Sequence, residues 1–183
     1  MITRVNREDT ILVAIDFQEK LMPAMKDSEE TIAGAKKMID RITIFDMPIL
    51  VTEQNPKGLG GTVEEIESSF GENVTKIEKN EFSCMANTEF KDALEKSGRN
   101  TVIVTGCETH VCVQQTVLDL LMSGYNVYVA IDGVSSRKKY MRKTALRRME
   151  AAGAVLTSYE AVLFELLGSA KDPNFKAISK LVK

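Results

Sequence analysis

One stretch of the sequence, Thr101–Val113, constrains the fold more than any other. It begins with five β-branched residues, TVIVT, a run typical of a strand buried on both faces of a parallel sheet. The run breaks at Gly106. From Thr109 onward apolar residues recur at spacings of three and four, which predicts a helix. Cys112 is therefore expected in the first turn of a helix, just beyond the end of a central strand.

This position favours a functional role for Cys112. Ligands of open α/β sheets bind outside the carboxyl ends of the strands. The positive end of a helix dipole also stabilises a thiolate and so lowers the pKa of a cysteine. The alternative is that Cys112 is a small buried hydrophobic residue, which is the more common role of a free cysteine. The turn between strand and helix favours the reactive interpretation.

The composition is that of an ordinary globular protein. The chain has 183 residues, of which 44% are hydrophobic and 27% charged, with a formal net charge of −2. This length predicts a single domain over residues 1–183. Basic residues are concentrated between Arg137 and Arg148, but they are spread along one predicted helix and indicate a solvated face. We therefore expect no nucleic-acid partner, and no apolar run is long enough to predict a membrane partner.

The cysteines and the N-terminal residues bear on the compartment. Cys84, Cys107 and Cys112 are odd in number and fit neither a zinc spacing nor a redox CxxC motif. The N-terminal residues lack the apolar stretch behind a basic flank that marks a signal peptide. These features predict a cytoplasmic protein in a reducing environment.

Predicted strands and helices alternate along the chain. The strands are Thr10–Asp16, Ile49–Thr52, Asn73–Ile77, Thr101–Thr105, Asn126–Ile131 and Ala154–Thr157. The helices begin near Asp27, Val63, Asn87, Thr109, Arg137, Ser158 and Asp172, and the first is opened by capping-box spacing between Asp27 and Glu30. This alternation predicts a three-layer αβα fold around a mainly parallel six-stranded sheet. The expected strand order is Rossmann-like, 3-2-1-4-5-6, which makes the first and fourth strands neighbours.

Three ionisable residues follow the ends of predicted strands. Asp16 ends the first strand, Lys79 follows the third and Cys112 follows the fourth. A carboxylate within hydrogen-bonding reach can act as the base for a thiol, and a nearby ammonium stabilises both anions. Taken singly, Asp16 is better explained by a helix or turn cap and Lys79 by a surface lysine. Their joint placement at strand ends favours a Cys-Asp-Lys triad.

The same residues carry a family resemblance. The segments Asp16-Phe17-Gln18, Lys79 with Phe82-Ser83 and the GxxTxxCV turn that ends at Val113 resemble the isochorismatase-like cysteine hydrolases. That superfamily includes nicotinamidases and carbamoylsarcosine-type amidohydrolases. The similarity runs from about Thr10 to Glu160. The TEQNPKGLG loop, Thr52–Gly60, resembles the branch called isochorismatase-domain proteins.

The resemblance implies specific roles at the site. Asp16, Lys79 and Cys112 would form the catalytic triad, and a non-proline cis peptide would join Cys107 to Glu108. The backbone N–H groups of Glu108 and Cys112 would then form an oxyanion hole. Four further residues near the predicted strand ends are candidates for lining the substrate pocket, although ordinary packing explains each equally well: Phe17, Gln54, Phe82 and Thr109.

The substrate class follows partly from what the sequence lacks. Nicotinamidases bind a metal through several histidines, whereas this chain has one, His110, which is expected to be structural or at the rim of the pocket. We therefore predict no metal and no cofactor. Isochorismate is disfavoured because its vinyl ether does not need a cysteine nucleophile. The leading hypothesis is a hydrolase that forms a thioester with a small amide, imide or related carbonyl compound.

Two other functions remain open on the sequence alone. The first is a catalytically idle, oligomeric binding or scaffold protein of the same fold, which an intact triad disfavours. The second is a thiol redox sensor that uses Cys107 and Cys112. Since members of the superfamily are often dimers or larger, we also expect a homo-oligomer.

Overall fold

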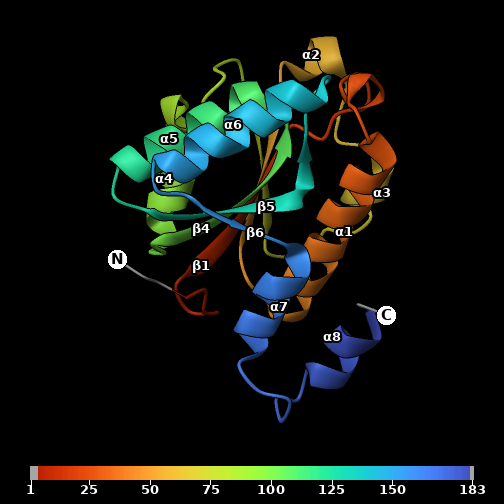
Figure 1. The fold of residues 1–183 in the computed structure, drawn as a ribbon, viewed down its shortest axis with the longest axis vertical. Coiled ribbons are helices and arrows are strands. Elements are labelled where there is room, and N and C mark those ends of the chain that lie inside the picture. The colour runs from red at the N-terminus through yellow and green to blue at the C-terminus, as the bar shows by residue number, and fades with distance from the viewer. Residues whose placement is uncertain (1–3, 182–183) are drawn as a thin grey trace.

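A six-stranded sheet forms the centre of the computed structural model, which describes residues 4–181 (Figure 1). All neighbouring strands pair in parallel, in the order β3-β2-β1-β4-β5-β6. The predicted strand order is confirmed, and the sheet is parallel throughout. The strands are β1 (Thr10–Ile15), β2 (Ile49–Gln54), β3 (Val74–Lys79), β4 (Thr101–Cys107), β5 (Asn126–Ser135) and β6 (Val155–Thr157).

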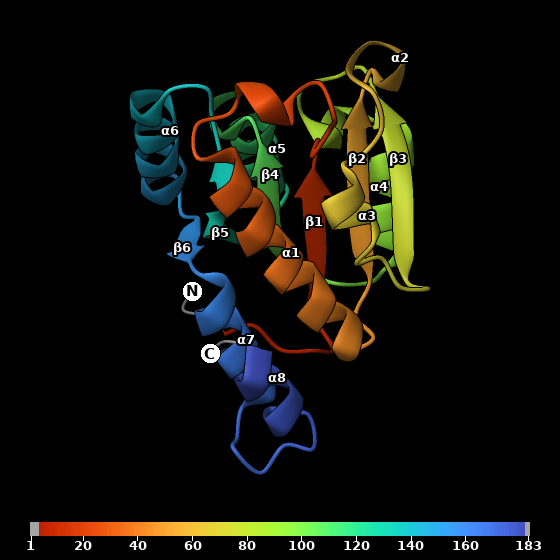
Figure 2. The same ribbon diagram turned by 90° about the vertical axis from the view of Figure 1, so that its right-hand side faces the viewer.

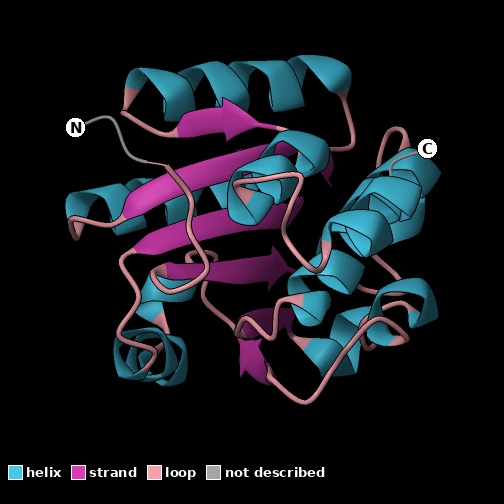
Figure 3. Cartoon of the chain, turned by 90° about the horizontal axis from the view of Figure 1, so that it is seen from below, coloured by secondary structure: helices cyan, strands magenta, loops and turns pink. Residues whose placement is uncertain are grey.

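Helices cover both faces of the sheet (Figures 2 and 3). Helices α1 (Ser28–Ile44) and α3 (Glu64–Glu67) lie on one face, and α4 (Thr88–Lys96), α5 (Gln114–Met122) and α6 (Lys139–Ala151) lie on the other. The remaining helices are α2 (Pro56–Leu59), α7 (Tyr159–Leu167) and α8 (Phe175–Leu181), with short helical turns at Met22–Ala24, Cys84–Ala86 and Thr109–Val113. Over residues 4–181, none of these helices combines the length and the apolar character needed to cross a membrane.

The two faces of β1 belong to two separate cores. All six of its residues are buried: Leu12 and Ala14 pack under α1, whereas Ile11, Val13 and Ile15 pack under α4 and α5. A central parallel strand covered on both sides has no polar face, which explains the continuous apolar run in the sequence. The edge strand β3 has only two buried residues, Ile77 and Lys79.

Gly106 allows the two central strands to approach closely near their carboxyl ends. Its φ angle is 134°, and a Cβ atom at this position would lie 2.2 Å from the carbonyl oxygen of Ile15. Only glycine fits both the backbone conformation and the space. The close approach sets Asp16, which follows β1, beside the turn that follows β4.

Some local features differ from the sequence-based prediction. The residue Asp27 does not cap α1 through its side chain: its backbone is left-handed and its carboxylate makes no capping hydrogen bond, so the capping box is wrong. Strand β5 extends four residues beyond the predicted end, to Ser135. Its register against β4 shifts between Val104 and Gly106, after which Cys107 pairs with Ser135. The pairing advances from Val129 to Val134 in β5 while it advances from Val104 to Gly106 in β4, a bulge-like irregularity of the kind that re-aims the last residues of a strand.

Candidate functional site

A buried ion pair joins the ends of β1 and β3. The Nζ atom of Lys79 lies 2.7 Å from Oδ2 of Asp16, and neither side chain is exposed to solvent. Lys79 reaches past the end of β2 to make this contact, because β2 lies between β3 and β1 in the sheet. Asp16 adopts a left-handed backbone conformation with φ 54°, which turns the chain out of the strand at this point.

All three hydrogens of the Lys79 ammonium have an acceptor. Besides Asp16, the ammonium donates to Oε1 of Gln54 at 2.7 Å and to the carbonyl oxygen of Glu81 at 3.3 Å. An ammonium has three donors and no acceptor, so this set satisfies it. Lys79 is therefore a fixed positive charge, and Gln54 helps to hold it.

The second oxygen of Asp16 is also hydrogen-bonded. The hydroxyl group of Thr52, near the end of β2, donates to Oδ1 of Asp16 at 2.7 Å. The thiol of Cys84 in turn donates to Oγ1 of Thr52, with 3.9 Å between sulfur and oxygen. The backbone N–H of Cys84 donates to Oγ1 of Thr116 at 2.9 Å. The carboxylate is thus oriented from both sides by buried polar groups.

Cys112 lies in a π-helical turn, Thr109–Val113, which continues into α5. Its residue exposure is 6%, and it lies near enough to Asp16 for the thiol and the carboxylate to shift each other's pKa. The structure therefore brings the carboxylate of Asp16, the ammonium of Lys79 and the sulfur of Cys112 together at the carboxyl edge of the sheet, from positions far apart in the sequence.

The charges of Asp16 and Lys79 depend on each other. Burial raises the pKa of Asp16, and the ammonium of Lys79, the Thr52 hydroxyl and the Cys112 thiol oppose that rise. Burial is the largest single influence on Lys79 and lowers its pKa, but Asp16, Cys84 and Cys112 together outweigh it, so the pKa of Lys79 lies above its usual value. We interpret the pair as ionised, with Asp16 a stronger base than an exposed aspartate.

The thiol of Cys112 is a weaker acid than an ordinary cysteine. Burial and the negative charge of Asp16 raise the pKa of Cys112 to about 12, although Lys79 opposes the shift. This is the opposite of what the helix dipole alone predicts from the sequence. In the resting state the sulfur is protonated, and Asp16 is the nearby acceptor for its proton.

One backbone N–H at the start of the turn that carries Cys112 has no protein partner among the described residues. The Cys107–Glu108 peptide bond is cis, as the family resemblance implies. The carbonyl oxygen of Glu108 accepts from the N–H groups of Val111 at 3.0 Å and Val113 at 3.3 Å. Within residues 4–181, the N–H of Glu108 itself makes no hydrogen bond to a protein atom. This group is free to bind an oxygen atom of a ligand.

The four candidate pocket residues have different surroundings. Phe17 is fully buried in the core under α1. Thr109 is also fully buried, and its hydroxyl has no hydrogen-bond partner among the described residues. Gln54 is half-buried and binds Lys79. Phe82 is 56% exposed. Their roles in binding a substrate remain predictions, with Phe82 the most accessible of the four.

Sequence reasoning missed Thr52 and Cys84 as members of the site. Thr52 pairs with Ile15 in the β1–β2 register, so it lies directly beside the end of the strand that carries Asp16. The predicted strand order could have identified it, since β1 and β2 are neighbours. Cys84 lies in a short helical turn that no strand pattern marks, and the sequence offers no signal for its contact with Thr52.

The other candidate groups lie elsewhere. Cys107 packs in the core under α1, whereas Cys112 packs in the core on the opposite face of the sheet, which disfavours a redox pair. The Nδ1 atom of His110 lies 3.0 Å from the hydroxyl of Ser136. Across the described part of the chain, no three His, Cys, Asp or Glu side chains cluster closely enough to hold a metal ion.

Relatives of known family are similar in sequence to this chain over almost its whole length. The isochorismatase domain model matches residues 10–161. Isochorismatase domain-containing protein 2 of Xenopus laevis is 37% identical over 99% of this chain and 87% of its own length. The secreted isochorismatase effector Isc1 of Phytophthora sojae is also 37% identical, over 98% of this chain and 87% of its own.

Solved structures share the fold. The MAR1 ribonuclease of Caenorhabditis elegans has a TM-score of 0.93 and 41% identity, with coverage of 98% of this chain and 92% of that one. The YcaC protein of Escherichia coli, described as an octameric hydrolase of unknown specificity, has a TM-score of 0.92 and 23% identity, with coverage of 99% and 90%. By its sequence, its strand order and the match over residues 10–161, this chain belongs to the isochorismatase family.

Proposed function

We propose that this chain is a cofactor-independent cysteine hydrolase that acts on a small amide, imide or related carbonyl compound. The observation that carries the proposal is the placement of one carboxylate, Asp16, beside both the Lys79 ammonium and the Cys112 thiol. A buried thiol beside an ionised carboxylate has the base that it needs to become a nucleophile.

In the first half of the proposed reaction, Asp16 accepts the proton of Cys112 while the sulfur attacks the carbonyl carbon of the substrate. The S–C bond forms, and the π electron pair moves to the carbonyl oxygen. The N–H groups of Glu108 and Cys112 donate to that oxyanion. One such donor is typically worth about 2.7–4 kcal/mol of transition-state stabilisation.

In the second half, Asp16 returns the proton to the leaving nitrogen as the C–N bond breaks. The product is a thioester on Cys112. Asp16 then takes a proton from water, the hydroxide oxygen attacks the thioester carbon, and the thiolate leaves and recovers a proton from Asp16. Overall, one water is consumed for each substrate cleaved, and no electrons are exchanged.

Lys79 has an electrostatic role in this scheme. Its three hydrogens bind Asp16, Gln54 and Glu81, so none is left for the substrate. Its charge keeps Asp16 ionised despite burial and partly offsets the negative charge that develops on sulfur. Removing it would leave a buried carboxylate unpaired, which typically destabilises a fold by about 3–5 kcal/mol.

The setting of the site bears on partners and location. Because Cys112 is only 6% exposed, the proposal is restricted to small-molecule substrates. The octameric state described for YcaC supports a homo-oligomer. Three free cysteines favour the cytoplasm, although one relative is described as secreted.

The ribonuclease name of the MAR1 relative provides a second candidate activity, cleavage of RNA. We favour the carbonyl hydrolase because the groups that meet at Cys112 are a base and a nucleophile suited to acyl transfer. The two activities are distinguished by the same experiment, in which RNA is one of the substrates.

A substrate screen of small amides, ureas, ring imides and RNA would test the proposal. We expect wild type to hydrolyse at least one carbonyl compound, and Cys112→Ser to abolish that turnover. Cys107→Ala, which removes a buried thiol on the other face of the sheet, is the matched control and should remain active. Full turnover by Cys112→Ser would refute the mechanism. No turnover of any substrate would support an idle scaffold protein, and turnover of RNA alone would support the ribonuclease.

A further inference from the structure

We propose that Arg137 is a positioning residue that holds the oxyanion-binding N–H of Glu108 in place through the Glu108 carboxylate. The inference rests on the proposed function, because it assigns a supporting residue to the same site. Arg137 follows β5 and Glu108 follows β4, and neither side chain takes part in the steps described above.

The Glu108 carboxylate is held by Arg137 through two donors. Its Oε2 atom accepts from the backbone N–H of Arg137 at 3.1 Å and from Nε of its guanidinium at 3.0 Å. The Glu108 side chain is 10% exposed and that of Arg137 is 58% exposed. A carboxylate this buried requires charged or N–H donors, and Arg137 supplies one of each kind.

The bulge-like irregularity of β5 explains why these two residues meet. After the register shift, Cys107 pairs with Ser135, so Glu108 and Arg137 leave neighbouring strand ends together. The end of β5 is itself anchored: the Nε of Arg142 donates to the carbonyl oxygen of Val134 at 2.9 Å. Arg137 therefore projects from a fixed support rather than from a free loop.

The contacts of Glu108 restrain every part of the residue except its N–H. Its carbonyl oxygen accepts from Val111 and Val113, and its carboxylate accepts from Arg137. With both groups fixed, the direction of the Glu108 N–H is set before a substrate arrives. Donors that are oriented in advance need no reorganisation in the transition state, which is the main source of their effect.

Two chemical probes of Cys112 distinguish this role from a general structural one. Acylation by p-nitrophenyl acetate develops an oxyanion and needs the hole, whereas alkylation by iodoacetamide is a displacement at carbon that needs only the sulfur. Arg137→Gln and Glu108→Gln are the test variants. Lys138→Gln removes the adjacent cation, which makes no contact with Glu108, and is the matched control.

Loss of a whole oxyanion donor typically lowers kcat by about 100- to 1,000-fold. The test variants keep the Glu108 N–H and remove only the contact that orients it. We therefore expect acylation of Cys112 to slow by about 10-fold in Arg137→Gln. Alkylation should stay within about 2-fold of wild type, and Lys138→Gln should match wild type in both reactions. Arg137→Lys, which keeps the charge and the backbone N–H, should recover part of the acylation rate.

A double variant tests whether Arg137 acts through Glu108. In a Glu108→Ala background, Arg137→Gln should not slow acylation further. The effects of two substitutions do not add when both residues act through the same contact. Additive losses would overturn the inference, and so would equal losses of acylation and alkylation. If Arg137→Gln is acylated at the same rate as wild type, the inference is also overturned, but the proposed function remains intact. If wild type itself is not acylated at Cys112, the proposed function fails and the inference fails with it.

Discussion

Asp16 lies between a thiol that it must deprotonate and an ammonium that keeps it charged. Burial raises its pKa and makes it a better base, whereas Lys79 and Thr52 oppose protonation. Too much of either effect would be unproductive: a protonated Asp16 accepts nothing, and a very weakly basic one cannot take the proton of a thiol whose pKa is raised to about 12. The two oxygens of the carboxylate are held separately, so this balance can be altered one contact at a time.

Thr52→Val removes the hydrogen bond to Oδ1 of Asp16 with little change in volume. Because that bond lowers the pKa of Asp16, its loss should raise the pKa further. Asp16 must be ionised to act as a base, so activity lost on acidification should be lost at a higher pH than in wild type. The measurement is the acid limb of the kcat/KM profile.

Thr75→Val, at an exposed position of β3, is the control for the loss of a threonine hydroxyl and should leave the profile unchanged. An acid limb that does not move in Thr52→Val would show that Thr52 does not set the basicity of Asp16.

The raised pKa of Cys112 predicts slow alkylation near neutral pH. Burial and Asp16 are its largest causes, so the rate of reaction with iodoacetamide should rise only well above pH 8.5, the usual cysteine value. Asp16→Asn removes the negative charge and should shift the alkylation profile to lower pH while abolishing hydrolysis. Rapid alkylation of wild type near pH 6 would show that a thiolate is already present.

The sequence predicts the three central side chains at strand ends, but it does not predict the groups that contact them or the shifts in their pKa values. Asp16 and Cys112 follow β-branched or apolar runs, whereas Lys79 is the last residue of β3, a strand that the sequence ends at Ile77; parallel strands bring such ends to one edge. Gln54 was assigned only to the pocket, yet it binds Lys79, because the reach of a lysine across a neighbouring strand depends on side-chain conformation. The raised pKa of Cys112 depends on burial, which helix position does not reveal.

Among the elements, patterning predicted strand order better than strand length. Strand β5 was expected to stop at Ile131 because Asp132 and Gly133 resemble a turn, but a bulge-like irregularity carries them within the strand. The short helix α2 was assigned to a glycine-rich loop, since four residues are too few for a helical period. In both cases the structure depends on local backbone hydrogen bonds, which the pattern of side chains does not determine.

The N-caps of α4 and α1 make a matched pair for a test of stability. Oδ1 of Asn87 accepts from the N–H of Phe90 at 3.0 Å, whereas Asp27 makes no side-chain capping bond. Asn87→Ala should therefore lower the free energy of unfolding by about 1 kcal/mol. Asp27→Asn keeps a residue type that tolerates the left-handed backbone, loses an exposed ion pair with Lys139 and should change it by less than about 0.5 kcal/mol. Urea unfolding measures both, and equal losses would contradict these cap assignments.

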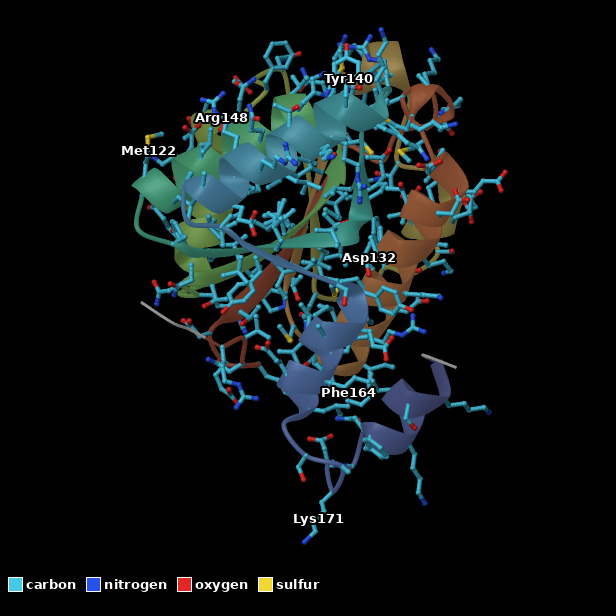
Figure 4. All side chains as sticks on the ribbon, in the orientation of Figure 1. Met122, Asp132, Tyr140, Arg148, Phe164 and Lys171 are labelled. Atoms are coloured by element: carbon cyan, nitrogen blue, oxygen red, sulfur yellow. The ribbon has the colours of Figure 1, made fainter. Side chains whose placement is uncertain are left out.

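At the scale of the whole molecule, large apolar side chains remain exposed on the α5 and α6 side of the sheet. Met122 is 78% and Tyr140 61% exposed, and both lie on that outer surface (Figure 4). The groove beside Met122 is also lined by Asp119 and Arg148, so the surface is mixed in character. Such patches are common at contacts between protein chains.

Light scattering after size exclusion tests the predicted homo-oligomer. The mass should be a multiple of the 20.3 kDa chain and independent of concentration over a wide range. Cys112→Ser should give the same mass, because assembly does not require the thiol. A mass of one chain at every concentration would refute the prediction.

The most direct test of the site is the identity of the acylated residue. Protein quenched in acid during reaction with p-nitrophenyl acetate can be digested, and the acetyl group located by mass spectrometry. The structure predicts a transient acetyl adduct on Cys112, and not on Cys84 or Cys107, that forms about 100- to 10,000-fold more slowly in Asp16→Asn. An adduct that is absent from Cys112, or that forms equally fast without Asp16, would contradict the assignment of nucleophile and base.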